Sequence, residues 1–77
     1  MQELLKVIVA GLVENPDAIE ITVDEPNEEG VVVYHLHVAQ EDTGRVIGKQ
    51  GRIAKAIRVI MRAGAARDNQ KITVEID

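Results

Sequence analysis

Val-Ile-Gly-Lys-Gln-Gly, residues 46–51, is the most informative segment of the sequence, and it leads directly into a helical pattern. Its two glycines bracket Lys49 and Gln50. A loop flanked by glycines can bring backbone N–H groups close to a phosphate chain, because no Cβ blocks the approach. The surrounding segment, from Arg45 to Arg67, carries seven basic residues and no acidic one. The stretch therefore predicts a nucleic-acid site.

The charges of the chain are divided between its two halves. Residues 1–44 carry one base and ten acids, a net charge of −9, whereas residues 45–77 carry eight bases and three acids, a net charge of +5. The sum, −4, hides this asymmetry. Because the acidic half repels a polyanion, we expect only one side of the molecule to bind nucleic acid.

Size and composition indicate one small globular domain. The chain has 77 residues, of which 45% are hydrophobic, and this share argues against disorder. It contains no cysteine, so neither a disulfide nor a thiolate metal site is available. The apolar stretch at residues 4–13 is too short to cross a bilayer and is expected to be a core helix rather than a signal peptide. The expected location is the cytoplasm.

The hydrophobic periodicity predicts three helices and three strands in the order α-β-β-α-α-β. Apolar residues at three- and four-residue spacing predict helices, whereas alternation predicts strands. Asp42 or Thr43 is expected to cap the short second helix. The predicted helices cover residues 2–14, 42–47 and 52–66, and the predicted strands cover residues 19–23, 31–39 and 72–76. This order implies an α+β domain in two layers.

The pattern also predicts which faces are buried. In the second strand, the expected core residues are Val32, Tyr34, Leu36 and Val38. The helix at residues 52–66 has an apolar face and an opposite basic face. The apolar face holds Ile53, Ile57, Ile60, Met61 and Gly64, and the basic face holds Arg52, Lys55, Arg58 and Arg62.

The segment from Val46 to Ile57 resembles the core of the KH (K-homology) RNA-binding domain. The hallmark of that family, Ile-Gly-x-x-Gly between two short helices, runs here from Ile47 to Gly51. The element order matches the type II, bacterial variant, in which the helices pack on one face of a three-stranded sheet. The resemblance covers residues 1–77 as a single KH domain and is closest to the small bacterial KhpA-like family. Many KH domains carry an aliphatic residue three places after the second glycine, where this chain has Ala54, so the packing below the loop is expected to differ.

The resemblance implies that the loop grips the backbone of single-stranded RNA, about four nucleotides long. The bases would lie in an aliphatic groove, in keeping with a chain that has one tyrosine and no Phe or Trp. A role as an RNA chaperone or as a subunit of an RNA-binding assembly is implied, with homodimerisation or pairing with a second KH-containing protein of the KhpB type. The implied RNA-binding residues are Ile47, Gly48, Lys49, Gln50, Gly51, Arg52 and Lys55.

Three other readings are weaker. A P-loop would need four residues between its glycines and a Ser or Thr after the lysine, whereas Gln50 stands there. His35 and His37 share one face of a strand, but no third metal ligand is identifiable, so they are expected to be solvent-facing sheet residues. No Cys or Ser is present as a nucleophile, so no catalytic residue, metal or cofactor is expected.

Two functional hypotheses remain open. The first is a single-stranded RNA binder that does not enter the membrane. The second is a protein-interaction module that keeps the KH fold and acts through its acidic half or through the small residues Ala63, Gly64, Ala65 and Ala66. RNA binding with and without an intact loop separates the two.

Overall fold

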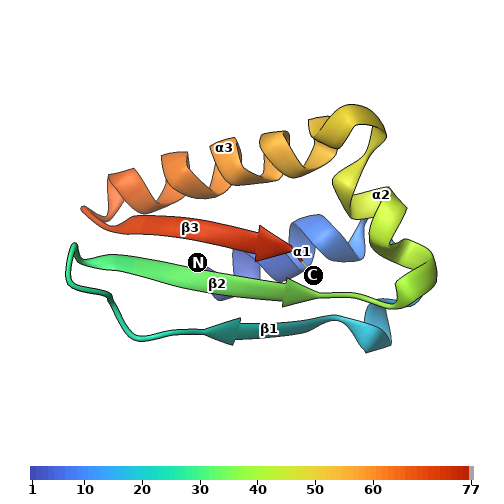
Figure 1. The fold of residues 1–77 in the computed structure, drawn as a ribbon, viewed down its shortest axis with the longest axis horizontal. Helices are drawn as coiled ribbons and strands as arrows, with labels where there is room; N and C mark the ends of the chain where they lie inside the picture. The colour runs from blue at the N-terminus through green and yellow to red at the C-terminus, as the bar shows by residue number, and fades with distance from the viewer. Residues whose placement is uncertain (77) are drawn as a thin grey trace.

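The computed structural model describes residues 1–76 and has the predicted order of helices and strands (Figure 1). Three 3₁₀ turns lie between them, at Pro16–Ala18 (η1), Gln40–Asp42 (η2) and Lys49–Gly51 (η3). Within the described residues, no helix is long and apolar enough to cross a membrane. The helices and strands are α1 (Gln2–Ala10), β1 (Glu20–Val23), β2 (Val31–His37), α2 (Thr43–Ile47), α3 (Arg52–Arg67) and β3 (Lys71–Ile76).

The first helix is shorter than the sequence predicts. It ends at Ala10, and the prediction that it continues to residue 14 is wrong. Gly11 follows as the C-cap, and glycine is a poor helix former. The N–H groups of Leu12 and Val13 both donate to the carbonyl of Val9, so the chain tightens into a turn here. Leu12 and Val13 still pack against the core, which is why their spacing resembled a helix.

The strands form one mixed sheet in the order β1-β2-β3. β1 is antiparallel to β2, with Ile21 opposite Leu36, and β3 is parallel to β2, with Val74 opposite Tyr34. A parallel pair needs a crossover connection, and here α2 and α3 supply it. α3 consequently runs back alongside β3, and its first residues lie near the end of that strand (Figure 1).

The core lies between the helices and one face of the sheet. Tyr34, Leu36 and Val38 are buried as predicted, and Val32 is partly buried against them. α1 contributes Leu5 and Val9 to the same core. The structure thus confirms a three-stranded sheet with its helices on one face.

The buried face of α3 is rotated from the predicted one. Ile57 and Met61 are buried as expected, but Ile60 is 46% exposed, so its placement in the core is wrong. Ala54 and Ala65 are buried instead. The prediction was based on bulky apolar residues and left alanine out. A small side chain, however, lets a helix approach its neighbours closely, and it is buried where the helix does so.

Candidate nucleic-acid interface

The turn between α2 and α3 is closed by hydrogen bonds within the chain. The N–H of Gly51 donates to the carbonyl of Gly48 at 3.2 Å, and the N–H of Arg52 donates to the carbonyl of Lys49. The backbone reverses through three positive φ angles, 75° at Gly48, 60° at Gln50 and 73° at Gly51. Gln50 is thus a non-glycine residue in a conformation that side chains disfavour.

The two glycines of the turn have different surroundings. A Cβ placed on Gly48 would lie 2.6 Å from Cγ1 of Ile53, whereas a Cβ on Gly51 would meet nothing within 4 Å. Gly48 therefore makes room for a side chain of the protein itself. Of the two, only Gly51 has open space where a Cβ would lie, and a close approach of phosphate there stays a prediction.

The backbone N–H groups of the turn differ in whether a partner within the chain uses them. The sequence predicts that the glycine-flanked loop brings backbone N–H groups close to phosphate, and those of Gly51 and Arg52 are already used inside the turn. Among the turn and cap hydrogen bonds of the described residues, none uses the amides of Lys49 and Gln50. These two amides stand just before a 16-residue helix, whose dipole places about half a positive charge at its N-terminus.

The basic residues of α3 do not form one uniform face. Lys49, Arg52 and Lys55 are exposed at or next to the turn, and Arg62 is exposed further along the helix. Arg58 is half-buried, and its Nε donates to the carbonyl of Val74 in β3 at 3.1 Å. Arg58 thus differs from the other members of the predicted basic face, because its side chain is held against β3.

Many KH domains have an aliphatic residue at the position of Ala54, and the packing below the turn explains why this chain differs. Ala54 is buried, and the preceding Ile53 is partly buried against the core and folds over Gly48. Ile47, the last residue of α2, is also partly buried against the core. Apolar contacts on both sides therefore hold the turn in place.

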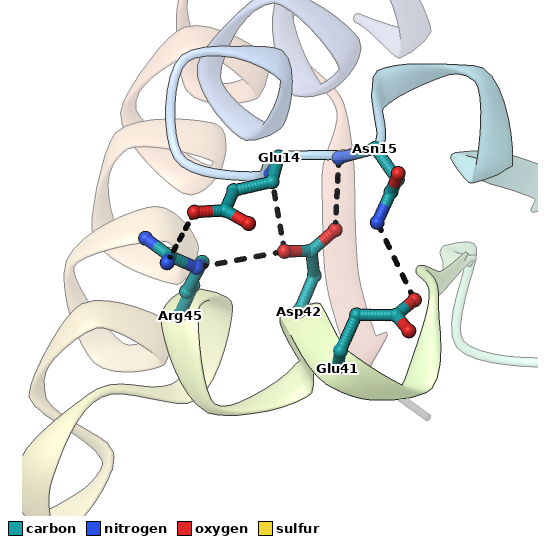
Figure 2. A network of polar contacts seen from close by, with 5 residues as sticks. All are labelled: Glu14, Asn15, Glu41, Asp42 and Arg45. Carbon is teal, nitrogen blue, oxygen red and sulfur yellow. Dashed lines mark hydrogen bonds and ion pairs between the residues drawn. The ribbon is translucent and has the colours of Figure 1, made fainter.

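A buried carboxylate fixes the start of α2 (Figure 2). Asp42 stands at the N-cap position, as predicted, but its carboxylate makes no capping hydrogen bond to the helix. Instead, it accepts the backbone N–H of Glu14 at 3.1 Å and that of Asn15 at 3.0 Å, both in the segment that follows α1. The Glu14 hydrogen bond is the main reason why the pKa of Asp42 is lowered, against the opposing effect of burial. Asp42 thus stays ionised and joins the acidic half of the chain to the element that leads into the turn.

Arg45 belongs to the same network rather than to the exposed basic surface. Its Nη2 lies 2.7 Å from Oε1 of Glu14, and its Nε lies 3.5 Å from Oδ1 of Asp42. A further hydrogen bond joins Nδ2 of Asn15 to Oε1 of Glu41 at 3.4 Å. Nothing in the sequence predicts the contacts of Arg45 with Glu14 and of Asn15 with Glu41, because these partners lie 31 and 26 residues apart.

The two histidines lie on the sheet face that carries no helix. His37 is exposed, and His35 is partly exposed. Nε2 of His35 lies 2.8 Å from Oδ2 of Asp24, and its Nδ1 lies 3.5 Å from Oε2 of Glu75. No group of three or more His, Cys, Asp or Glu residues in the described part of the chain could hold a metal ion.

Comparison with known proteins identifies the family. The model of the KhpA/KhpB KH domain matches residues 2–76. The chain belongs to the KhpA/KhpB KH-domain family. Relatives named RNA-binding protein KhpA include those of Clostridium acetobutylicum and Caldanaerobacter subterraneus, each 49% identical over 76 residues and covering 99% of both chains. The relative from Chlamydia trachomatis is 42% identical and covers 99% of this chain and 95% of its own.

Solved structures share the fold of this chain. Two structures of Era, one from Aquifex aeolicus with bound GDP and aluminium fluoride and one with part of 16S ribosomal RNA, match with a TM-score of 0.67. The match covers 96% of this KH chain but only 28% of Era, at 19% identity. At this identity the likeness concerns the fold alone.

Proposed function

We propose that the protein binds single-stranded RNA through the turn between α2 and α3, and acts in the cytoplasm as an RNA chaperone or as a subunit of an RNA-binding assembly. The observation that carries the proposal is the turn itself. It presents the amides of Lys49 and Gln50 at the start of α3, with open space at Gly51 and exposed cations on either side. The names of the relatives support the same activity.

Each residue of the proposed site has a distinct task. The amides of Lys49 and Gln50 donate to a phosphate, and the Lys49 ammonium neutralises it. Arg52 and Lys55 contact the phosphates that follow along α3. Gly51 leaves room for the RNA backbone, while Gly48 and Ile47 hold the turn in shape. No catalytic residue, metal or cofactor takes part.

The test compares two double variants, each of which replaces one Lys and one Gln by Asp. One pair precedes α3 and the other pair follows it. Lys49→Asp with Gln50→Asp places two carboxylates where phosphate is proposed to lie. Gln70→Asp with Lys71→Asp makes the same chemical change at the far end, where both residues are also exposed. Fluorescence anisotropy with a labelled uridine-rich RNA is expected to show loss of binding for the first variant only. Equal affinity of both folded variants would refute the site.

A second role, in assembly, is favoured by apolar side chains that α1 and α3 leave exposed. Val7 is 70% exposed and Val59 is 63% exposed, and Leu4 and Ile60 are also exposed. We propose that these helices mediate a homodimer or pairing with a KhpB-type protein. The four small residues predicted as a docking patch are less suited to this, because Ala65 is fully buried and the place of a Cβ on Gly64 is filled by Met1. Sedimentation analysis of Val59→Lys and of wild type tests the proposal. If wild type is a dimer and the variant has the same mass, this surface is refuted as the interface.

A further inference from the structure

Arg58 stands apart from the other basic residues of α3. Its Nε donates to the Val74 carbonyl, and its side chain is half-buried. Arg52, Lys55 and Arg62 are exposed, and their side chains make no hydrogen bond or ion pair within residues 1–76. The difference is not explained by a general need for positive charge, which an exposed side chain would meet equally well.

The Arg58 hydrogen bond joins α3 to the edge of the sheet. Among the residues that the structure describes, only β2 pairs with β3, so β3 is an edge strand and one side of its backbone is left outside the sheet. The guanidinium therefore lies between the helix and this strand. Arg58 follows Gly51 by seven residues, which is about 10 Å along a helix at 1.5 Å per residue. An RNA strand held at the turn and running along α3 would reach it within a few nucleotides.

The hydrogen bond leaves most of the donors of Arg58 available. A guanidinium has five N–H groups in one plane, and only that of Nε is used. The four N–H groups on the two Nη atoms form a planar fork. Because the bond to Val74 already restrains the side chain, less conformational entropy is lost when the fork binds a ligand.

We infer that Arg58 reads a guanine base, by donating from its two Nη atoms to O6 and N7. This inference rests on the proposed function, since it requires an RNA strand held at the turn. Guanine presents two adjacent acceptors on this edge, whereas adenine presents an acceptor beside a donor and cytosine presents a donor. In a single strand these edges are open to side chains. Arg58 thereby adds base preference to a site whose other cations contact phosphates.

The test removes one acceptor atom from the base. Uridine heptamers carry a single guanosine at each position in turn, and a matched set carries 7-deazaguanosine, which lacks N7. Wild type is expected to bind the best guanosine heptamer at least about fivefold more tightly than its 7-deaza counterpart, as for a bidentate contact. Arg58→Ala is expected to bind both equally, and Arg62→Ala, one turn further on, is expected to keep the wild-type preference.

Arg58→Lys keeps the charge and the long stem but lacks the fork. It is expected to bind the all-uridine heptamer as wild type does and to lose the guanosine preference, which decides the question even if Arg58→Ala does not fold. Equal binding of the two heptamers by wild type overturns the inference and leaves the proposed function standing. A uniform loss of affinity in Arg58→Ala would assign Arg58 to a phosphate and also overturn it. Absence of all RNA binding by wild type would instead refute the proposed function.

Discussion

Replacing the two glycines of the turn by alanine is expected to destabilise the protein to different extents. At Gly48, with φ 75° and ψ 174°, the backbone lies in a region that is open essentially to glycine alone, and strain of this kind costs about 1–3 kcal/mol. The new Cβ would also lie 2.6 Å from Cγ1 of Ile53, and forced repacking of a core side chain typically adds about 1–3 kcal/mol. The sum, roughly 2–6 kcal/mol, is a large share of the stability of a domain of this size.

At Gly51 only the backbone term applies. Its φ is 73° and its ψ is 15°, a left-handed conformation that costs an alanine about 1–2 kcal/mol, and no atom lies within 4 Å of the added Cβ. Urea unfolding followed by circular dichroism measures both variants against wild type. We expect Gly48→Ala to be the less stable of the two by at least about 1 kcal/mol.

A double-mutant cycle with Ile53→Ala isolates the steric part. This change removes Cγ1 and Cδ1, two of the three atoms that crowd the new Cβ. The cost of Gly48→Ala should therefore fall in the Ile53→Ala background, whereas the cost of Gly51→Ala should stay the same. Equal losses for both glycines, or no coupling between Gly48 and Ile53, would refute the assignment of Gly48 to internal packing.

Two further predictions concern charge. If Lys49, Arg52 and Lys55 neutralise three phosphates, the logarithm of the RNA affinity should fall against the logarithm of salt concentration with a slope near −2, since each contact contributes about −0.7. In anisotropy titrations, Lys55→Ala should reduce the magnitude of this slope by about 0.7. A slope near zero would show that these cations are not the contact surface. Because the pKa of Asp42 is lowered by folding, the stabilisation from its ionised form should be complete at neutral pH and be lost as the pH falls below about 4. Asp42→Asn should thus melt well below wild type at pH 7 and approach it in acid; a gap independent of pH would contradict this account.

The turn and its place in the order of elements could be predicted from the sequence, because both depend on local signals. Glycines at positions 48 and 51 permit the positive φ angles that the turn uses, and apolar periods of two and of three to four residues predict strands and helices. The division of charge between the halves is likewise a property of the chain alone. These features are also the ones that resemble the KH family.

Tertiary structure decided which neighbour each of these residues has. The burial of Ala54 in place of Ile60 depends on how closely the elements pack, which periodicity does not encode. Asp42 accepts amides 28 and 27 residues away, and Arg58 donates to a carbonyl 16 residues away. Such contacts exist only once the chain has folded, because their geometry is set by the packing of helices on the sheet rather than by the residues that flank each partner.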